Sequence, residues 1–200
     1  MSKISWSPSD AQLMAAALCP KFTAMASVVG SSLIIRDVIQ IRNSKSYPLS
    51  KRHRVLCGMS VCDIISSLAL FLTSWPVPED TILGFLTVWN VGNTQTCAAQ
   101  GFFTQFGAGT VLYNACLALY YLLVIRYGLK NEYIAKRIEP WMHFVVVGVA
   151  LSVGAAGLAL DLFNPTVHNC AIAAYPRFCT QSWENKGPTN CIHGDNARIY

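Results

Sequence analysis

The sequence has little charge. Only 12% of its 200 residues are Asp, Glu, Lys or Arg, whereas soluble domains carry roughly 25%. Hydrophobic residues make up 53% of the chain, and a chain of this length allows one domain. So few charged side chains cannot coat a soluble globule, which excludes that class and places the apolar excess against lipid.

The chain also lacks the short motifs of common soluble functions. It has no glycine-rich phosphate loop, its four histidines are scattered, and Cys57 and Cys62 do not have thioredoxin-like spacing. Glycosylation acceptors of the Asn-x-Ser/Thr type are absent too. The net charge is +5, but most basic residues lie in two short loops between apolar runs. We therefore expect no enzyme activity, no cofactor, no metal site and no nucleic-acid partner.

Four apolar runs are present, at about 13–41, 55–77, 94–126 and 141–163. Each exceeds the roughly 20 residues that cross a hydrocarbon core of about 30 Å. Within lipid such segments must be helical, because every backbone polar group needs an internal partner. The predicted fold class is an all-α membrane protein with four transmembrane helices, followed by a long loop at 164–200.

The loops predict the orientation. The first and third loops carry the basic residues, and the second carries only acidic ones, Glu79 and Asp80. The positive-inside rule then makes the first and third loops cytoplasmic and places the amino terminus, second loop and residues 164–200 outside. We expect an integral, multi-pass protein of the plasma membrane whose first helix serves as an uncleaved signal anchor.

Four cysteines fall on the predicted outer side. Cys97 stands at the outer mouth of the third helix, and Cys170, Cys179 and Cys191 follow the fourth. An oxidising compartment favours two disulfides, for which three connectivities are open. The pairing that we favour is Cys97–Cys170 with Cys179–Cys191.

Polar and small residues recur at helical spacing within the runs. Such faces tend to meet protein rather than lipid, and small residues let neighbouring backbones approach closely. The predicted inward faces are Ser60, Asp63, Ser67 and Ser74 on the second helix; Thr96, Gln100, Phe103, Gly107, Thr110 and Asn114 on the third; and Gly148, Ser152, Ala155 and Ala159 on the fourth.

Asp63 is the most informative single residue. A charge at mid-helix costs about 2.5–3.5 kcal/mol on insertion scales, so Asp63 should face a cavity or a partner. One interpretation is a cation site or a protonation-sensitive switch; the other is a structural hydrogen-bond hub to Ser31 or Asn114. With Ser67, these residues form the predicted intramembrane polar core.

Three ordered features resemble G-protein-coupled receptors. The first helix has a glycine-polar-apolar stretch at 29–35 followed by a basic loop, and the second has Asp63 at mid-membrane. Trp89 and Gly92 precede Cys97, as tryptophan and glycine precede the cysteine that opens the third helix of those receptors.

The run 97–103, followed by Tyr113 and Asn114, is most similar to the cyclic-AMP-receptor-like and secretin-like branch. This resemblance implies the first half of a seven-helix bundle, so residues 1–200 are expected to be a single incomplete receptor domain that stops after the second outer loop. It also implies a partner for Cys97 in that loop, an extracellular ligand, and coupling to a heterotrimeric G protein. The expected ligand contacts are Trp75, Gln100, Phe103 and Thr104, and the expected coupling residues are Arg52, Arg54, Arg126, Tyr127 and Lys130.

Other interpretations stay open. Arg126 and Tyr127 can equally anchor a helix end in the lipid headgroups. The chain can also be a complete four-helix scaffold or adhesion protein. A transporter that uses Asp63 as a proton relay needs a second ionisable group at membrane depth, and we find none in the sequence.

Overall fold

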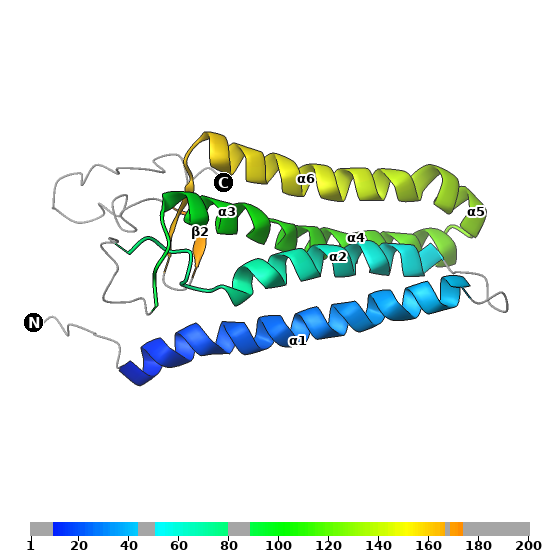
Figure 1. Cartoon of the computed structure of the whole chain (residues 1–200). Coiled ribbons are helices and arrows are strands. Elements are labelled where there is room, and N and C mark those ends of the chain that lie inside the picture. The colour runs from blue at the N-terminus through cyan, green and yellow to red at the C-terminus, as the bar shows by residue number, and fades with distance from the viewer. Residues whose placement is uncertain (1–9, 44–50, 80–88, 167–168, 174–200) are drawn as a thin grey trace, which may run out of the picture. The chain divides into compact units, whose positions relative to one another are not determined.

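The computed structural model describes residues 10–43, 51–79, 89–166 and 169–173. Helices dominate these residues (Figure 1): α1 (Asp10–Asn43), α2 (Lys51–Phe71), α3 (Thr94–Thr104), α4 (Phe106–Ile125), α5 (Asn131–Tyr133), the π-helical segment η1 (Ile134–Ile138) and α6 (Glu139–Ala159). Strands β1 (Phe163–Pro165) and β2 (Cys170–Ile172) form an antiparallel hairpin.

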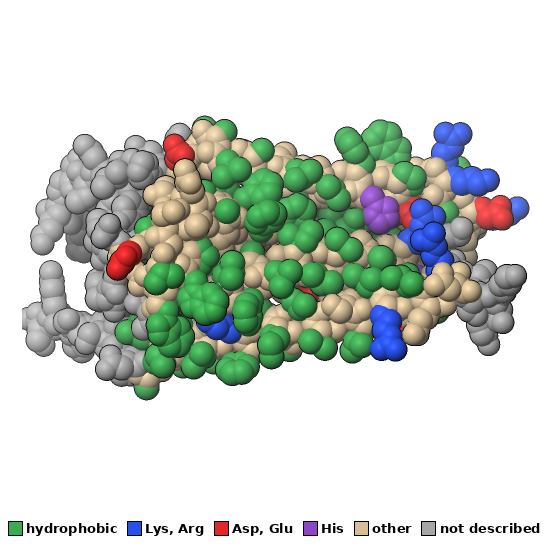
Figure 2. All heavy atoms as spheres, in the orientation of Figure 1, with side chains coloured by type: hydrophobic (Ala, Val, Ile, Leu, Met, Phe, Trp, Pro, Cys, Tyr) green, Lys and Arg blue, Asp and Glu red, His purple; other side chains and the backbone are tan. Residues whose placement is uncertain are grey.

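Within the described part of the chain, four helical stretches are long and apolar enough to cross a membrane, which confirms the predicted number. They are Ala11–Asn43, His53–Phe71, Thr94–Ile125 and Asn131–Ala159. Large apolar side chains on them are exposed, among them Ile125 at 79% and Phe144 at 69%, and hydrophobic side chains cover much of the visible helix surface (Figure 2). A soluble monomer rarely exposes so much apolar surface. The chain therefore has the character of a multi-pass integral membrane protein.

The chain divides into two compact units. The first, which we call the disulfide unit, comprises residues 1–23, 70–102 and 157–200. The second, the polar-core unit, comprises residues 24–69 and 103–156. The contacts described below all lie within one unit or the other.

Helix α2 ends at Phe71, six residues before the predicted end at 77. Residues 72–76 form successive turns instead, and Thr73 adopts a positive φ of 48°. Pro76 has no N–H to donate and disfavours the helical conformation at the residue before it, so an apolar run can continue here while the helix cannot. The pair Trp75 and Pro76 predicts a kink or an exit at the outer end of this helix, and the helix ends about one turn earlier, at Phe71.

Helix α6 ends at Ala159, whereas the fourth span was predicted to reach 163. Asp161 adopts a positive φ of 48°. The Leu162 N–H donates to the Gly157 carbonyl at 2.9 Å, and the Asp161 N–H to the Leu158 carbonyl at 3.4 Å. These bonds form a Schellman motif, which satisfies carbonyls that the helix end leaves unpaired. The chain turns into β1 at Phe163, a hairpin that the sequence analysis did not predict.

The third predicted span is interrupted at Gln105, between α3 and α4. The fourth begins earlier than its predicted start at 141, since α5, η1 and α6 follow one another from Asn131. Gly128, at a φ of +61°, makes the preceding turn.

Helices α2, α4 and α6 pack together in the polar-core unit. Their shared core contains Val55 and Cys62 from α2, Tyr113 from α4 and Val146 from α6. The predicted docking stripe on α6 is wrong, because Gly148, Ser152, Ala155 and Ala159 are all exposed. The buried face of α6 carries Met142, Val146, Ala150 and Gly154 instead. On α4, the close contact is made by Gly109. A Cβ added there would lie 3.2 Å from Cys62 of α2 and 3.5 Å from Val146 of α6.

Candidate functional site

Asp63 of α2 is held by two serines of α1. Its Oδ2 accepts hydrogen bonds from the hydroxyls of Ser27, at 2.6 Å, and Ser31, at 2.7 Å. The serines are four residues apart, so they lie one above the other on the same helix face. The carboxylate therefore ties α1 to α2, in an environment where a polar group without a partner is costly.

The predicted polar core is only partly assembled around Asp63. Ser31 is a direct partner, and Ser67 is buried on α2. Asn114 is exposed, and its amide donates to the Thr110 carbonyl of its own helix at 3.2 Å. Ser27 was missed, although its spacing from Ser31 was a usable signal. The geometry is that of the hydrogen-bond hub, and the cation or protonation role of Asp63 stays a prediction.

In the disulfide unit, Cys97 of α3 is bonded to Cys170 of β2. This confirms the favoured pairing for these two cysteines; Cys179 and Cys191 lie outside the described residues. About one turn after Cys97 on α3, the buried side-chain amide of Gln100 makes hydrogen bonds to the backbone of two other segments. Its Nε2 donates to the Thr73 carbonyl at 2.8 Å, and its Oε1 accepts from the Cys170 N–H at 2.9 Å.

Close packing reinforces the same region. Phe163 of β1 lies against glycines of two helices, because a side chain on Gly101 would come within 2.4 Å of its ring and one on Gly157 within 2.5 Å. Gly92 donates its N–H to the Val77 carbonyl at 3.0 Å, and a Cβ added at this glycine would collide with the backbone of Pro76. These glycines are required by close approach rather than by flexibility.

Lys21 of α1 is a functional group that the sequence analysis passed over. Its Nζ donates to the carbonyls of Phe71, at 3.0 Å, and Leu72, at 3.3 Å. The same Nζ lies 3.9 Å from the centroid of the Trp75 ring, within cation–π range. Lys21 therefore serves the carbonyl end of α2 as a cationic cap.

The predicted ligand contacts fall in both units. Trp75 is partly exposed beside Lys21, and Gln100 is buried with backbone partners on both sides of its amide. Phe103 and Thr104, which follow on α3, belong to the polar-core unit. Gln100 thus has a structural role, and a common ligand pocket for the four residues stays a prediction.

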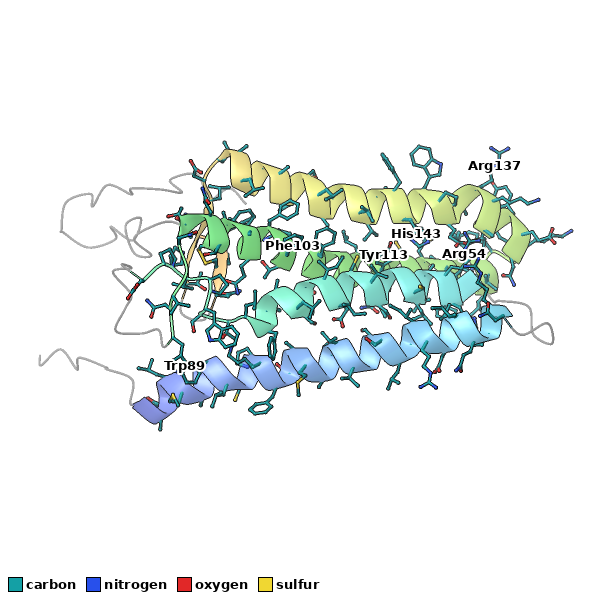
Figure 3. All side chains as sticks on the ribbon, in the orientation of Figure 1. Arg54, Trp89, Phe103, Tyr113, Arg137 and His143 are labelled. Carbon is teal, nitrogen blue, oxygen red and sulfur yellow. A yellow bond between two sulfur atoms is a disulfide. The ribbon has the colours of Figure 1, made fainter. Side chains whose placement is uncertain are left out.

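A polar network links α2, α4 and α6 in the polar-core unit (Figure 3). The Tyr113 hydroxyl lies 2.8 Å from Nδ1 of His143. Arg54 Nε lies 2.7 Å from Oε1 of Glu139. This contact is an ion pair and does not have the alignment of a hydrogen bond. His143 Nε2 is 3.8 Å from the same oxygen. The Glu139 side chain is only 3% exposed, and that of Arg54 is 53% exposed.

The network needs Gly58 of α2 at its centre. A Cβ there would lie 2.8 Å from the ring of Tyr113 and 3.1 Å from that of His143. Any side chain at this position would push the tyrosine away from the histidine. Residue spacing does not indicate this contact, since Gly58 and Tyr113 are far apart in the chain.

No family model, curated protein or solved structure matches this chain. The function of the chain is therefore inferred from its own residues.

The predicted coupling residues are distributed over the polar-core unit. Arg126 and Tyr127 are exposed where α4 ends, and Lys130 is exposed where α5 begins. Arg54 is exposed but paired with Glu139. The Arg52 side chain lies outside the described ones. Among the residues that the structure describes, no group of three or more His, Cys, Asp or Glu side chains could hold a metal ion.

Proposed function

We propose that this chain is part of a signalling receptor of the G-protein-coupled type, similar to the cyclic-AMP-receptor-like and secretin-like branch, and supplies its first four helices and second outer loop. The observation that carries the proposal is the Cys97–Cys170 disulfide. It joins the start of the third span to the hairpin after the fourth, which is the linkage that the resemblance implies.

The distribution of charge supports a direction for the signal. The disulfide-bearing side faces outward and binds an extracellular ligand, while the basic segments 42–54 and 126–140, which include helix ends, face the cytosol. A ligand that contacts the outer ends of the helices acts by favouring one packing of the helices over another. Arg126, Tyr127 and Lys130, which are exposed around the α4–α5 turn, then contact a heterotrimeric G protein.

The orientation is tested with a reporter fused after Tyr200 in cells. The receptor proposal expects this end outside, together with protection of the first and third loops from an extracellular protease. A four-helix scaffold with both termini inside expects the reporter in the cytosol. That second result would remove the receptor proposal.

Coupling is tested by energy transfer between the labelled chain and a labelled heterotrimeric G protein in cells. We expect proximity that falls when guanine nucleotide is added, and that weakens in Arg126→Gln and Lys130→Gln. Lys136→Gln is the matched control, because it removes a charge that is also exposed, on η1, outside the predicted coupling set. Equal effects of all three variants would mean nonspecific charge attraction and would contradict the proposal.

A further inference from the structure

A groove opens on the polar-core unit beside the Arg54–Glu139 pair. Its volume is about 550 Å³, within the roughly 300–1,000 Å³ of ligand sites. Residues of α1, α2 and α6 line it: Val38, Ile39 and Arg42; Arg54, Cys57, Gly58 and Val61; and His143. Most of these side chains are apolar, and none of them is acidic.

The groove is amphipathic along the helices. Arg42 lies in the last turn of α1 and Arg54 in the first turn of α2, so both arginines mark the end of the groove at the 44–50 connection. Val38, Ile39 and Val61 lie one to two turns deeper into the spans. A charged end at the membrane boundary and an apolar trough toward the membrane interior match the two parts of a phospholipid.

The arginines favour a negative headgroup. Arg42 is exposed, and the Arg54 side chain is half exposed although its Nε faces Glu139. A guanidinium carries five N–H donors, so Arg54 can contact a phosphate through its other nitrogens. The His143 ring is fixed by Tyr113 and forms part of the wall. Basic pockets between helices on the cytoplasmic side are suited to anionic lipid headgroups.

We infer that this groove binds one anionic phospholipid of the cytoplasmic leaflet. The phosphate lies between Arg42 and Arg54, and an acyl chain follows Val38, Ile39 and Val61. The inference requires that the helices span a membrane with this end in the cytosol, an orientation that it shares with the receptor proposal. It does not require an extracellular ligand or a G protein, so loss of coupling would leave it standing.

Binding is measured by native mass spectrometry on the full chain in detergent, titrated with phosphatidylserine or with phosphatidylcholine. We expect one phosphatidylserine to bind at least fivefold more tightly than phosphatidylcholine. Arg42→Gln should weaken phosphatidylserine binding about fivefold, which corresponds to ~1 kcal/mol for one basic residue at an anionic surface. Arg36→Gln is the matched control, since Arg36 is exposed on the same helix but does not line the groove.

A second pair of variants tests the apolar part of the groove, where the acyl chain is placed, without changing the charge of the protein. Val61→Trp should fill the groove and weaken phosphatidylserine binding, whereas Leu68→Trp, at an exposed position of α2 outside the lining, should not. Both side chains are exposed, so both variants should fold, which their melting temperatures check. Equal loss in Arg36→Gln and Arg42→Gln, equal binding of the two lipids, or full competition by soluble glycerophosphoserine would each overturn the inference.

Discussion

Replacing Gln100 with leucine removes both backbone contacts of a buried amide while nearly preserving its volume. The variant leaves the Thr73 carbonyl and the Cys170 N–H without the bonds of 2.8 and 2.9 Å that they now make with Gln100. Each buried group left unpaired costs about 1–3 kcal/mol, although side-chain bonds between membrane helices average only about 0.6 kcal/mol. We therefore expect a loss of about 2–4 kcal/mol, equivalent to a fall in Tm of roughly 5–15 °C.

Two measurements check this expectation in detergent micelles. The Tm comes from labelling of the cysteine thiols with a fluorogenic dye during heating, to which the buried Cys62 contributes. The rate at which a mild reductant opens Cys97–Cys170 reports the hairpin itself, and this rate should rise in Gln100→Leu. Gln95→Leu is the control, because Gln95 is exposed on the same helix. If both variants matched the parent in Tm and in reduction rate, the assignment of Gln100 as a structural clamp would be wrong.

Substitutions at Asp63, Gly58 and Cys97 probe other contacts by thermal unfolding. Asp63→Leu should cost about 1–3 kcal/mol because two serine hydroxyls lose their acceptor, and Asp63→Asn less because an amide oxygen still accepts; equal losses would refute the hub. Gly58→Val should cost about 1–3 kcal/mol by displacing Tyr113, whereas Gly30→Ala, with open space around it, should be neutral or stabilising; similar effects would refute the packing argument. Cys97→Ser should reduce the mobility shift on reduction, to which the predicted Cys179–Cys191 bond also contributes, and cost up to about 4 kcal/mol through the loss of a 73-residue loop constraint; an unchanged Tm would contradict this expectation.

Hydropathy predicted the helices well because crossing a membrane requires long apolar helical runs. It predicted their ends poorly. The end of α2 is decided by Pro76 and by the turns around Thr73, and the end of α6 by the Schellman motif at Asp161, all within residues that are apolar on average. Local backbone chemistry rather than mean hydropathy sets these boundaries.

Side-chain contacts, like the helices, were predictable only in part. The sequence predicted that Asp63 needs a partner and named Ser31, because an intramembrane carboxylate is costly when unpaired. It could not choose between Ser31 and Asn114, since that depends on how the helices are rotated about their axes. The same limit explains the wrong docking stripe on α6. Spacing shows that residues share a face, but not that the face meets a neighbour.

The polar residues of the disulfide unit follow from one physical requirement. A helix end leaves four carbonyls without helical partners, and lipid supplies no water to satisfy them. Because α2 stops at Phe71 within an apolar run, the carbonyls around this end need donors from the following turn or from other elements. The Thr73 N–H donates to the Leu70 carbonyl and the Trp75 N–H to the Leu72 carbonyl. Lys21 of α1 donates to the carbonyl of Phe71, the last residue of α2, and adds a second bond to that of Leu72, while Gln100 of α3 donates to the Thr73 carbonyl beyond the helix.

Lys21 and Gln100 therefore donate to carbonyls at and just beyond the end of α2. A lysine in an apolar run looks like a defect or a functional site when the run is considered alone. It is explained once the orphan carbonyls of a neighbouring helix are counted. An early helix end within an apolar run thus predicts hydrogen-bond donors on the neighbouring helices. Neither hydropathy nor residue spacing predicts such donors.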